Sequence, residues 1–261
     1  MRKLLLAVAL LAVPALSAAA ANDPWTGTWK LDPAKSHFTG DTFTYSQLAN
    51  GLMHYSNGST QGFDFGIDGK EYSAVYGRTT IWTAAGANAW DTVTRFKGTV
   101  VAKAHRELSS DGKTLTLVES GTRPDGSSFK EEDVYTRVSG SAGLAGKWRS
   151  VKVNTSASDT FVFSFPTPDR VEWENPGFQE KVVGKADGSD LPIIGPDVPP
   201  GGTVAVKLDS ATKHSYVIKS NGKVVAYGVQ TLSADGTSLT DVTWNPGKQA
   251  EKTTAVYIKQ Q

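Results

Sequence analysis

The chain contains one unit twice, and this duplication limits its possible folds more than any other feature of the sequence. Residues 27–30 (GTWK) return as residues 146–149 (GKWR), and residues 108–116 (LSSDGKTLT) return as residues 232–240 (LSADGTSLT). The motifs keep their order and nearly the same offset, so insertions of a few residues explain the differences. Two similar domains in tandem are therefore expected, and a single barrel made of both halves is the alternative.

A short run of small residues lies between the two copies. Residues 139–143 (SGSAG) have the composition of a flexible linker. The sequence thus predicts a first domain at residues 22–139 and a second at residues 144–261, and each has an ordinary domain size.

The spacing of turn residues predicts strands rather than helices. In each copy an Asp-Gly pair, at residues 111–112 and 235–236, separates two apolar segments. Asp-Gly favours a hairpin turn because such a turn needs positive φ angles. Similar pairs recur along the chain, and no convincing amphipathic helix is present. We therefore expect an all-β fold, either a sandwich or a barrel.

The first copy resembles a known group of β-barrel proteins. Its residues 27–32 (GTWKLD), 34–36 (AKS) and 111–116 (DGKTLT) resemble secreted bacterial lipocalin-like proteins, and Gly-x-Trp near the start of a barrel domain looks like the lipocalin signature. The second copy keeps Gly-x-Trp and the hairpin but departs from the pattern at residues 151–154. The resemblance implies two tandem antiparallel lipocalin-like β-barrels.

The resemblance also implies four structural residues. In lipocalins the signature Trp closes one end of the barrel, and a basic residue from the last strand lies against it. These roles fall to Trp29 and Trp148, and to Arg137 and Lys259. Within the first copy we expect Arg137 to lie against Trp29, where a cation and an aromatic face attract each other.

Residues 1–21 have the pattern of a secretory signal peptide. Arg2 and Lys3 supply positive charge, residues 4–16 form an apolar run, and residues 19–21 (AAA) are small enough for cleavage before Asn22. The apolar run is shorter than the roughly 20 residues that span a bilayer, which disfavours a membrane anchor. The chain has no cysteine and so no lipid-anchor motif. A periplasmic or secreted location is expected.

The charges and the histidines argue against several functional classes. There are 27 Lys and Arg residues against 26 Asp and Glu residues, for a net charge of +1. Nothing in this balance points to nucleic acid or to an anionic membrane. His37, His54, His105 and His214 form no metal-binding motif, and no Gly-x-Ser-x-Gly elbow occurs. We expect neither metal nor cofactor, and the oligomeric state stays open.

Alternation along the repeated hairpin predicts which side chains face the barrel interior. Every second position in residues 100–108 is small and apolar in both copies, so this phase is expected to point inward. Arg106 breaks the pattern, and Glu119 shares the inward phase of the next strand. Their counterparts Gln230 and Thr243 are neutral. An inward Arg106 and Glu119 are expected to pair, because a buried charge needs a partner.

The first copy also holds the aromatic candidates for a ligand pocket. Pockets combine aromatic walls with a few polar groups, whereas packing in the core is the alternative role for each aromatic residue. The candidates besides Arg106 and Glu119 are Tyr45, Tyr55, Tyr72, Tyr76, Trp82, Trp90 and His105.

Together these features favour an exported binding protein for a small apolar or aromatic molecule, with the first barrel as the binding unit. One alternative is an enzyme without metal or cofactor, a lyase or isomerase acting on a hydrophobic substrate. Arg106, Glu119, His105 or a tyrosine would then act as acid, base or oxyanion donor. The other alternative is a cell-envelope interaction protein whose barrels are filled by side chains. The fold by itself does not decide among them.

Export predicts a defined mature N-terminus. The protein recovered from a periplasmic or culture-medium fraction is expected to begin at Asn22, because signal peptidase cleaves after small residues. N-terminal sequencing checks this, and a cytoplasmic pool that still begins at Met1 would contradict export.

Overall fold

The computed structural model describes residues 23–140, 142–155, 160–167 and 169–261. Its regular structure consists of strands β1 to β20 and one short 3-10 helix, η1 (Val75–Gly77). No helix in this part of the chain is long and apolar enough to cross a bilayer. The predicted signal peptide at residues 1–21 lies outside the described residues.

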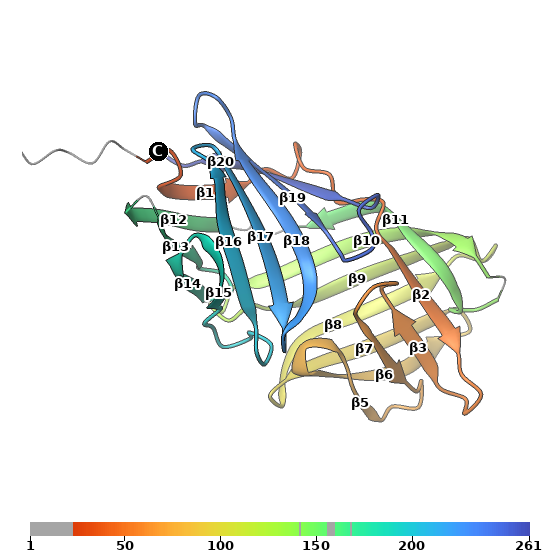
Figure 1. Cartoon of the computed structure of the whole chain (residues 1–261). Helices are drawn as coiled ribbons and strands as arrows, with labels where there is room; N and C mark the ends of the chain where they lie inside the picture. The colour runs from red at the N-terminus through yellow and green to blue at the C-terminus, as the bar shows by residue number, and fades with distance from the viewer. Residues whose placement is uncertain (1–22, 141, 156–159, 168) are drawn as a thin grey trace, which may run out of the picture.

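The strands form two separate antiparallel sheets, each curved into a barrel (Figure 1). In the first barrel the spatial order is β4 (Gly62–Phe65), β3 (Met53–Ser56), β2 (Thr42–Gln47), β11 (Gly146–Thr155), β10 (Ser128–Ser139), β9 (Thr114–Thr122), β8 (Thr99–Leu108), β7 (Ala89–Phe96), β6 (Arg78–Gly86) and β5 (Glu71–Ser73).

The second barrel has the same number of strands and an equivalent order. It runs β14 (Glu180–Lys185), β13 (Arg170–Asn175), β12 (Thr160–Thr167), β1 (Gly27–Leu31), β20 (Thr253–Lys259), β19 (Ser238–Trp244), β18 (Lys223–Leu232), β17 (Lys213–Ser220), β16 (Thr203–Ser210) and β15 (Asp187–Pro192).

Both barrels are nearly closed, because the two edge strands of each sheet approach each other. In the second barrel, Lys181 on β14 and Ile194 beyond β15 exchange two backbone hydrogen bonds of 2.8 and 2.9 Å across this gap. The expected all-β class and the two tandem antiparallel lipocalin-like barrels are confirmed.

The strands that carry the Gly-x-Trp motifs are exchanged between the two copies. β1 pairs with β12 and β20 of the second barrel, while β11 pairs with β10 and β2 of the first. Figure 1 shows β1 beside β12 and β2 beside β11. The barrels therefore do not divide at the linker as the sequence predicts, since residues 22–139 and residues 144–261 each give one strand to the other barrel.

The exchange also changes the partners of the closing tryptophans. Arg137 lies over the ring of Trp148, with its Cζ atom 4.2 Å from the ring centroid, and the Nζ atom of Lys259 lies 5.2 Å from that of Trp29. The expected contact between Arg137 and Trp29 is wrong, because Trp29 leaves the first copy with β1. The predicted pairing of a basic residue with each Trp holds in both barrels.

Each closing tryptophan is fully buried, and its indole N–H has a hydrogen-bond acceptor. Trp29 and Trp148 have no exposed surface, and their Nε1 atoms donate to the carbonyls of Trp25 at 2.8 Å and Leu144 at 3.0 Å. A buried indole removes a large apolar area from water, and its N–H needs an acceptor there. Each Trp thereby fixes the chain segment four residues before it.

A lysine of the second barrel holds the crossing from β1 to β2 in place. The Nζ atom of Lys248, between β19 and β20, donates to the Thr42 carbonyl at 2.6 Å and lies 3.1 Å from Asp41 Oδ1. It also pairs with Glu251 at 2.7 Å, and the Glu251 carboxylate accepts from the Thr42 backbone N–H at 3.1 Å. This network, in which Lys248 is buried and Asp41 and Glu251 are not, joins the two barrels where the exchanged strand leaves one for the other.

The predicted inward phase of the hairpin matches the burial pattern. Ala102, Ala104 and Leu108 on β8 are buried, as is Leu115 on β9. Val100 is the exception at 40% exposed, because the register with β7 shifts between Val100 and Ala102. Such a shift moves side chains to the other face of a strand.

The exchange predicts which fragment folds alone. Residues 39–155 contain all ten strands of the first barrel and are expected to melt cooperatively. Residues 22–139 lack β11 and the buried Trp148, which leaves the edges of β2 and β10 unpaired, so this fragment is expected to be less stable. Circular dichroism melts compare them, and equal stability would mean that β1 replaces β11.

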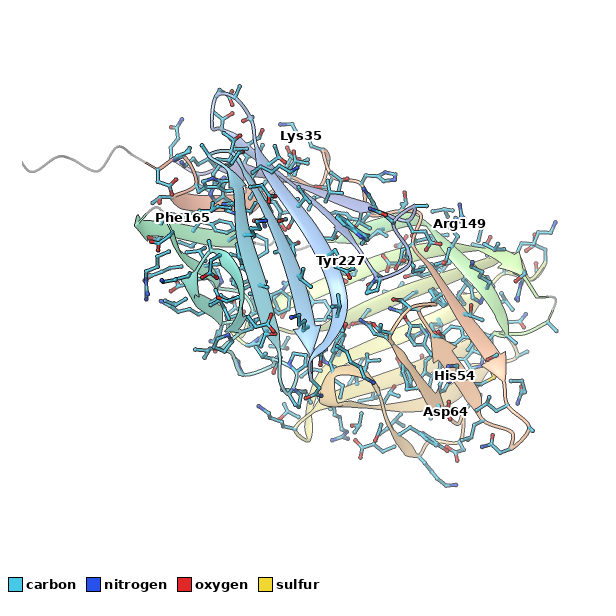
Figure 2. All side chains as sticks on the ribbon, viewed as in Figure 1. Lys35, His54, Asp64, Arg149, Phe165 and Tyr227 are labelled. Carbon is cyan, nitrogen blue, oxygen red and sulfur yellow. The ribbon has the colours of Figure 1, made fainter. Side chains whose placement is uncertain are left out.

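Arg137→Ala is expected to destabilise the protein by about 2 kcal/mol. The side chain donates to the carbonyls of Gly112, Ala145 and Gly143, each at 2.6 Å, as well as covering Trp148. Urea unfolding measures the loss. Arg149→Ala is the matched control, because Arg149 is exposed on the same strand as Trp148 (Figure 2). Equal effects of the two substitutions would show that the contact stabilises nothing.

Candidate functional site

The interior of the first barrel contains a cavity of about 250 Å³. Its wall combines aromatic rings with hydroxyl groups and two guanidinium groups, and the residues come from most strands of the barrel. The lining side chains are Phe43, Tyr45, Tyr55, Phe63, Ala74, Val75, Arg78, Thr80, Trp82, Thr92, Thr94, Arg106, Leu115, Leu117 and Tyr135.

Aromatic rings in mutual contact form one side of this cavity. The ring of Tyr45 lies 5.7 Å from that of Tyr55 and 5.9 Å from that of Trp82, and Trp82 stacks on Phe65 at 4.3 Å. The rings of β2, β3, β4 and β6 meet because alternate residues of each strand point inward. Such contacts hold the rings in fixed orientations, so the wall is preformed.

Arg106 on β8 provides a positive charge inside this aromatic wall. Its Cζ atom lies 4.4 Å from the centroid of the Trp82 ring, and its Nη1 atom donates to Thr92 Oγ1 at 2.9 Å. Among the described residues, no carboxylate forms an ion pair with it. A guanidinium has five N–H donors, so Arg106 retains donors for a ligand.

A second hollow of about 310 Å³ continues the interior toward the second barrel. It shares Arg78 and Thr94 with the first cavity and includes Glu119. Phe178 and Asp197, from loops of the second barrel, complete its wall. The cavity and the hollow therefore adjoin, with Arg106 in the wall of the first and Glu119 in the wall of the second.

Two carboxylates in this interior have altered acidity. Burial raises the pKa of Glu119, which the positive charge of Arg106 partly offsets. Burial likewise raises the pKa of Asp133, although Tyr135 donates its hydroxyl to Asp133 Oδ2 at 2.8 Å and thereby favours the ionised form. The buried Asp133 Oδ1 atom has no hydrogen-bond partner within the described chain.

The structure brings together five of the nine predicted ligand-contacting residues. Arg106, Tyr45, Tyr55 and Trp82 line the cavity, and Glu119 lines the hollow beside it.

The other predicted aromatic residues lie outside the cavity wall. Trp90 is buried in the hydrophobic core. Tyr72 packs against that core and donates its hydroxyl to Asp68 Oδ2 at 3.0 Å. Tyr76, in η1, has a positive φ of 61°, and its hydroxyl oxygen accepts from Gln61 Nε2. None of these three side chains lines the cavity.

His105 points away from the interior. It is exposed, and its Nδ1 atom lies 2.7 Å from Asp91 Oδ1 on the outer face. His54 and Asp64 form a similar pair on β3 and β4, with 2.6 Å between Nδ1 and Oδ1 (Figure 2). The expectation that His105 contacts a ligand in the barrel is wrong, because it has the outward phase of β8, next to the inward Arg106.

Arg106 and Glu119 face the same interior, but no ion pair joins them within the described part of the chain. Arg106 lies opposite Leu117 in the ladder, and Glu119 lies opposite Ala104. The guanidinium instead packs over Trp82 and donates to Thr92. The expected direct pair is therefore replaced by a longer-range attraction.

Three further charged residues, Arg78, Glu131 and Asp133, belong to this interior and are not among the predicted ones. Strand parity contains the signal for the two acids. β10 pairs with β9 so that Asp133 lies opposite Leu117 and Glu131 opposite Glu119, and these β9 residues carry the inward phase. Arg78 begins β6 directly after η1, where no alternation precedes it, so the sequence gives no comparable signal.

Metal ligands are a separate question. Within the described residues, no three or more His, Cys, Asp or Glu side chains are grouped so that they could hold a metal ion.

Comparisons with known proteins assign no family to the chain. No family model matches it, and no curated protein matches it. One solved structure, the crystal structure of the di-domain ARO/CYC StfQ from the steffimycin biosynthetic pathway, is 8% identical. That match covers 85% of this chain and 76% of the other, with a TM-score of 0.15. Such a low score carries no argument about fold or function.

Removal of an interior charge is expected to stabilise the protein at neutral pH. Because the pKa of Asp133 is raised in the folded state, its ionisation opposes folding as the pH rises above the pKa of the unfolded chain. Asp133→Asn should therefore be more stable than the unmodified protein at pH 8, and the difference should vanish at pH 3. Urea unfolding at both values tests this, with the exposed Glu107→Gln as control. A gain that persists at pH 3 would point to packing instead.

Proposed function

We propose that the protein binds a small aromatic molecule that carries an anionic or hydrogen-bond-accepting group, inside the first barrel. The observation that carries the proposal is the guanidinium of Arg106, which lies in an aromatic cavity and pairs with no carboxylate of the described chain. Arg106 is half-buried, and taking a charge partly out of water costs free energy unless the charge is paired. A ligand acceptor beside Arg106 would supply the missing partner.

The size of the cavity agrees with a ligand of one or two rings. An apolar cavity of roughly 150 Å³ accommodates benzene, and the cavity of the first barrel measures about 250 Å³. Tyr45, Tyr55 and Trp82 offer ring faces and edges against which an aromatic ligand can pack. These contacts support a ligand whose aromatic part lies between β2, β3 and β6.

A second unsatisfied donor supports an acceptor-bearing ligand. The indole Nε1 of Trp82 is buried without a hydrogen-bond partner among the described residues, and Arg106 lies over the same ring. An unpaired buried donor costs roughly 1–3 kcal/mol. Both donors favour a carboxylate or a similar oxygen group at this end of the cavity.

The cellular setting of this function is part of the same proposal. Residues 1–21 would direct export, and binding would take place in the periplasm or outside the cell. The positive Arg2 and Lys3, the apolar run and the small residues before Asn22 support this.

An enzyme acting in the same cavity is the second candidate. It is supported by Glu119 and Asp133, two interior carboxylates with raised pKa values, because acids and bases in active sites often have shifted acidity. In that case a ligand would be converted after binding. Mass spectrometry of the ligand recovered after prolonged incubation separates the two candidates, since a binding protein returns it unchanged.

The proposed binding is tested with a matched pair of probes. 2-Naphthoate and 2-naphthamide share their rings and differ in charge, so calorimetric titration measures the contribution of the carboxylate. We expect naphthoate to bind at least tenfold more tightly. Arg106→Gln should abolish most of this preference, because Gln, which the second copy has at the equivalent position, is neutral.

The control for this experiment is Arg149→Gln, which removes a positive charge from the exposed face of β11. It should leave both affinities unchanged. Equal affinities of the two probes for the unmodified protein, or an unchanged preference in Arg106→Gln, would contradict the proposed role of Arg106.

A further inference from the structure

The second barrel has its own cavity, with a volume of about 150 Å³. Its wall is mainly aromatic and aliphatic, and it includes Phe161, Phe163, Val171, Trp173, Ile193 and Val206. An apolar cavity of about this size binds benzene. The cavity therefore has room for one six-membered ring.

A carboxylate, Asp241 on β19, forms part of this otherwise apolar wall and is only 8% exposed. Tyr216 donates its hydroxyl to Oδ1 at 2.9 Å, and Gln230 Nε2 donates to Oδ2 at 3.2 Å. No cationic side chain in the described part of the chain forms an ion pair with it. A carboxylate offers about four acceptor positions, so Asp241 can accept from a further donor.

A neutral histidine lies in the same wall. His214 on β17 is 1% exposed and stacks on Trp25 with 3.5 Å between the ring centroids. Its Nε2 atom has no hydrogen-bond partner among the described residues. Burial lowers the pKa of His214 to about 4, so it supplies no positive charge for Asp241 at neutral pH. The equivalent residue of the first barrel is Trp90.

The two barrels have different polar residues at equivalent places. Gln230 lies opposite Asp241 in the β18–β19 ladder, just as Arg106 lies opposite Leu117 in the β8–β9 ladder. The first barrel forms with Leu117 at this position, so the fold does not require a carboxylate there. A buried carboxylate without a counter-ion is costly. Its presence in the second barrel therefore indicates a binding role.

We propose that the cavity of the second barrel binds a small aromatic amine in its protonated form. The ring lies among Phe161, Phe163 and Trp173, and the ammonium group donates to Asp241. The neutral His214 lines the same cavity and adds no positive charge that would compete with the amine. The two barrels then take groups of opposite charge, since the first offers Arg106 and the second offers Asp241.

Calorimetric titration of the full mature protein with benzylamine and benzyl alcohol tests this proposal. The two probes have the same ring and nearly the same size, but only benzylamine carries a positive charge at neutral pH. We expect benzylamine to bind at least tenfold more tightly. Asp241→Asn should remove this preference, because Asn still accepts from Tyr216 but is neutral.

Asp190→Asn is the matched control for the loss of a negative charge. It removes an exposed carboxylate from β15 (Asp187–Pro192) of the same barrel, so the benzylamine affinity should stay unchanged. Equal affinities of benzylamine and benzyl alcohol for the unmodified protein would overturn the proposal without any variant, as would Asp241→Asn that is folded by circular dichroism and keeps the preference. An equal loss of the preference in Asp190→Asn would show that it follows the net charge of the barrel rather than Asp241, and would also overturn the proposal.

The pH dependence gives an independent measurement. Burial raises the pKa of Asp241 to about 6, so the affinity for benzylamine should be lower at pH 5 than at pH 8. Among the described residues, the titratable groups that contact Asp241 or line the same cavity are Tyr216 and His214 on β17, and Tyr257 on β20 acts on Tyr216. Burial raises the pKa of Tyr216 well above its usual value, and His214 titrates near pH 4. Asp241→Asn should abolish the pH effect, and an unchanged effect in this variant would contradict the assignment.

Discussion

The packing of one basic side chain on one buried tryptophan in each barrel is the contact on which the rest of the structure depends. Trp148 closes the first barrel under Arg137, and Trp29 closes the second under Lys259. Each Trp lies on a strand supplied by the other copy. The two barrels therefore cannot complete their ladders independently, and closure of one is linked to the position of the other. Exchange of an identical element is a known route by which repeated domains associate.

Closure allows the interiors to carry charges. A closed barrel has few free strand edges, and its inward side chains are shielded from water. In that setting a charge favours a partner of opposite charge. Within the described chain, neither the cation of Arg106 nor the anion of Asp241 forms an ion pair. Both charges are held by neutral hydrogen-bond partners, Thr92 for Arg106 and Tyr216 for Asp241. The two copies thus contain cavities of the same architecture, one with the cation Arg106 in its wall and the other with the anion Asp241.

Strand parity explains why part of the site was predictable. Arg106 and Glu119 lie on regular strands within a hairpin whose turn is marked by Asp111-Gly112, so alternation alone gives their inward direction. The same rule, applied across the ladder to β10, gives Asp133. It fails for Tyr72 and Tyr76, which lie on a very short strand and in η1, where no alternation is established. His105 has the outward phase of β8, so parity excludes it from the interior although its chemistry makes it a candidate.

The sequence by itself determined the all-β class, the duplication and the inward phase of the hairpin, because these depend on turn residues and on a two-residue period that is local in the chain. Only the tertiary structure decided that β1 and β11 are exchanged. Gly27–Leu31 and Gly146–Thr155 carry the same Gly-x-Trp motif, so local propensity cannot distinguish their partners. That choice depends on long-range pairing with β20 and β10 and on the path of the crossing segment, which Lys248 holds beside Thr42.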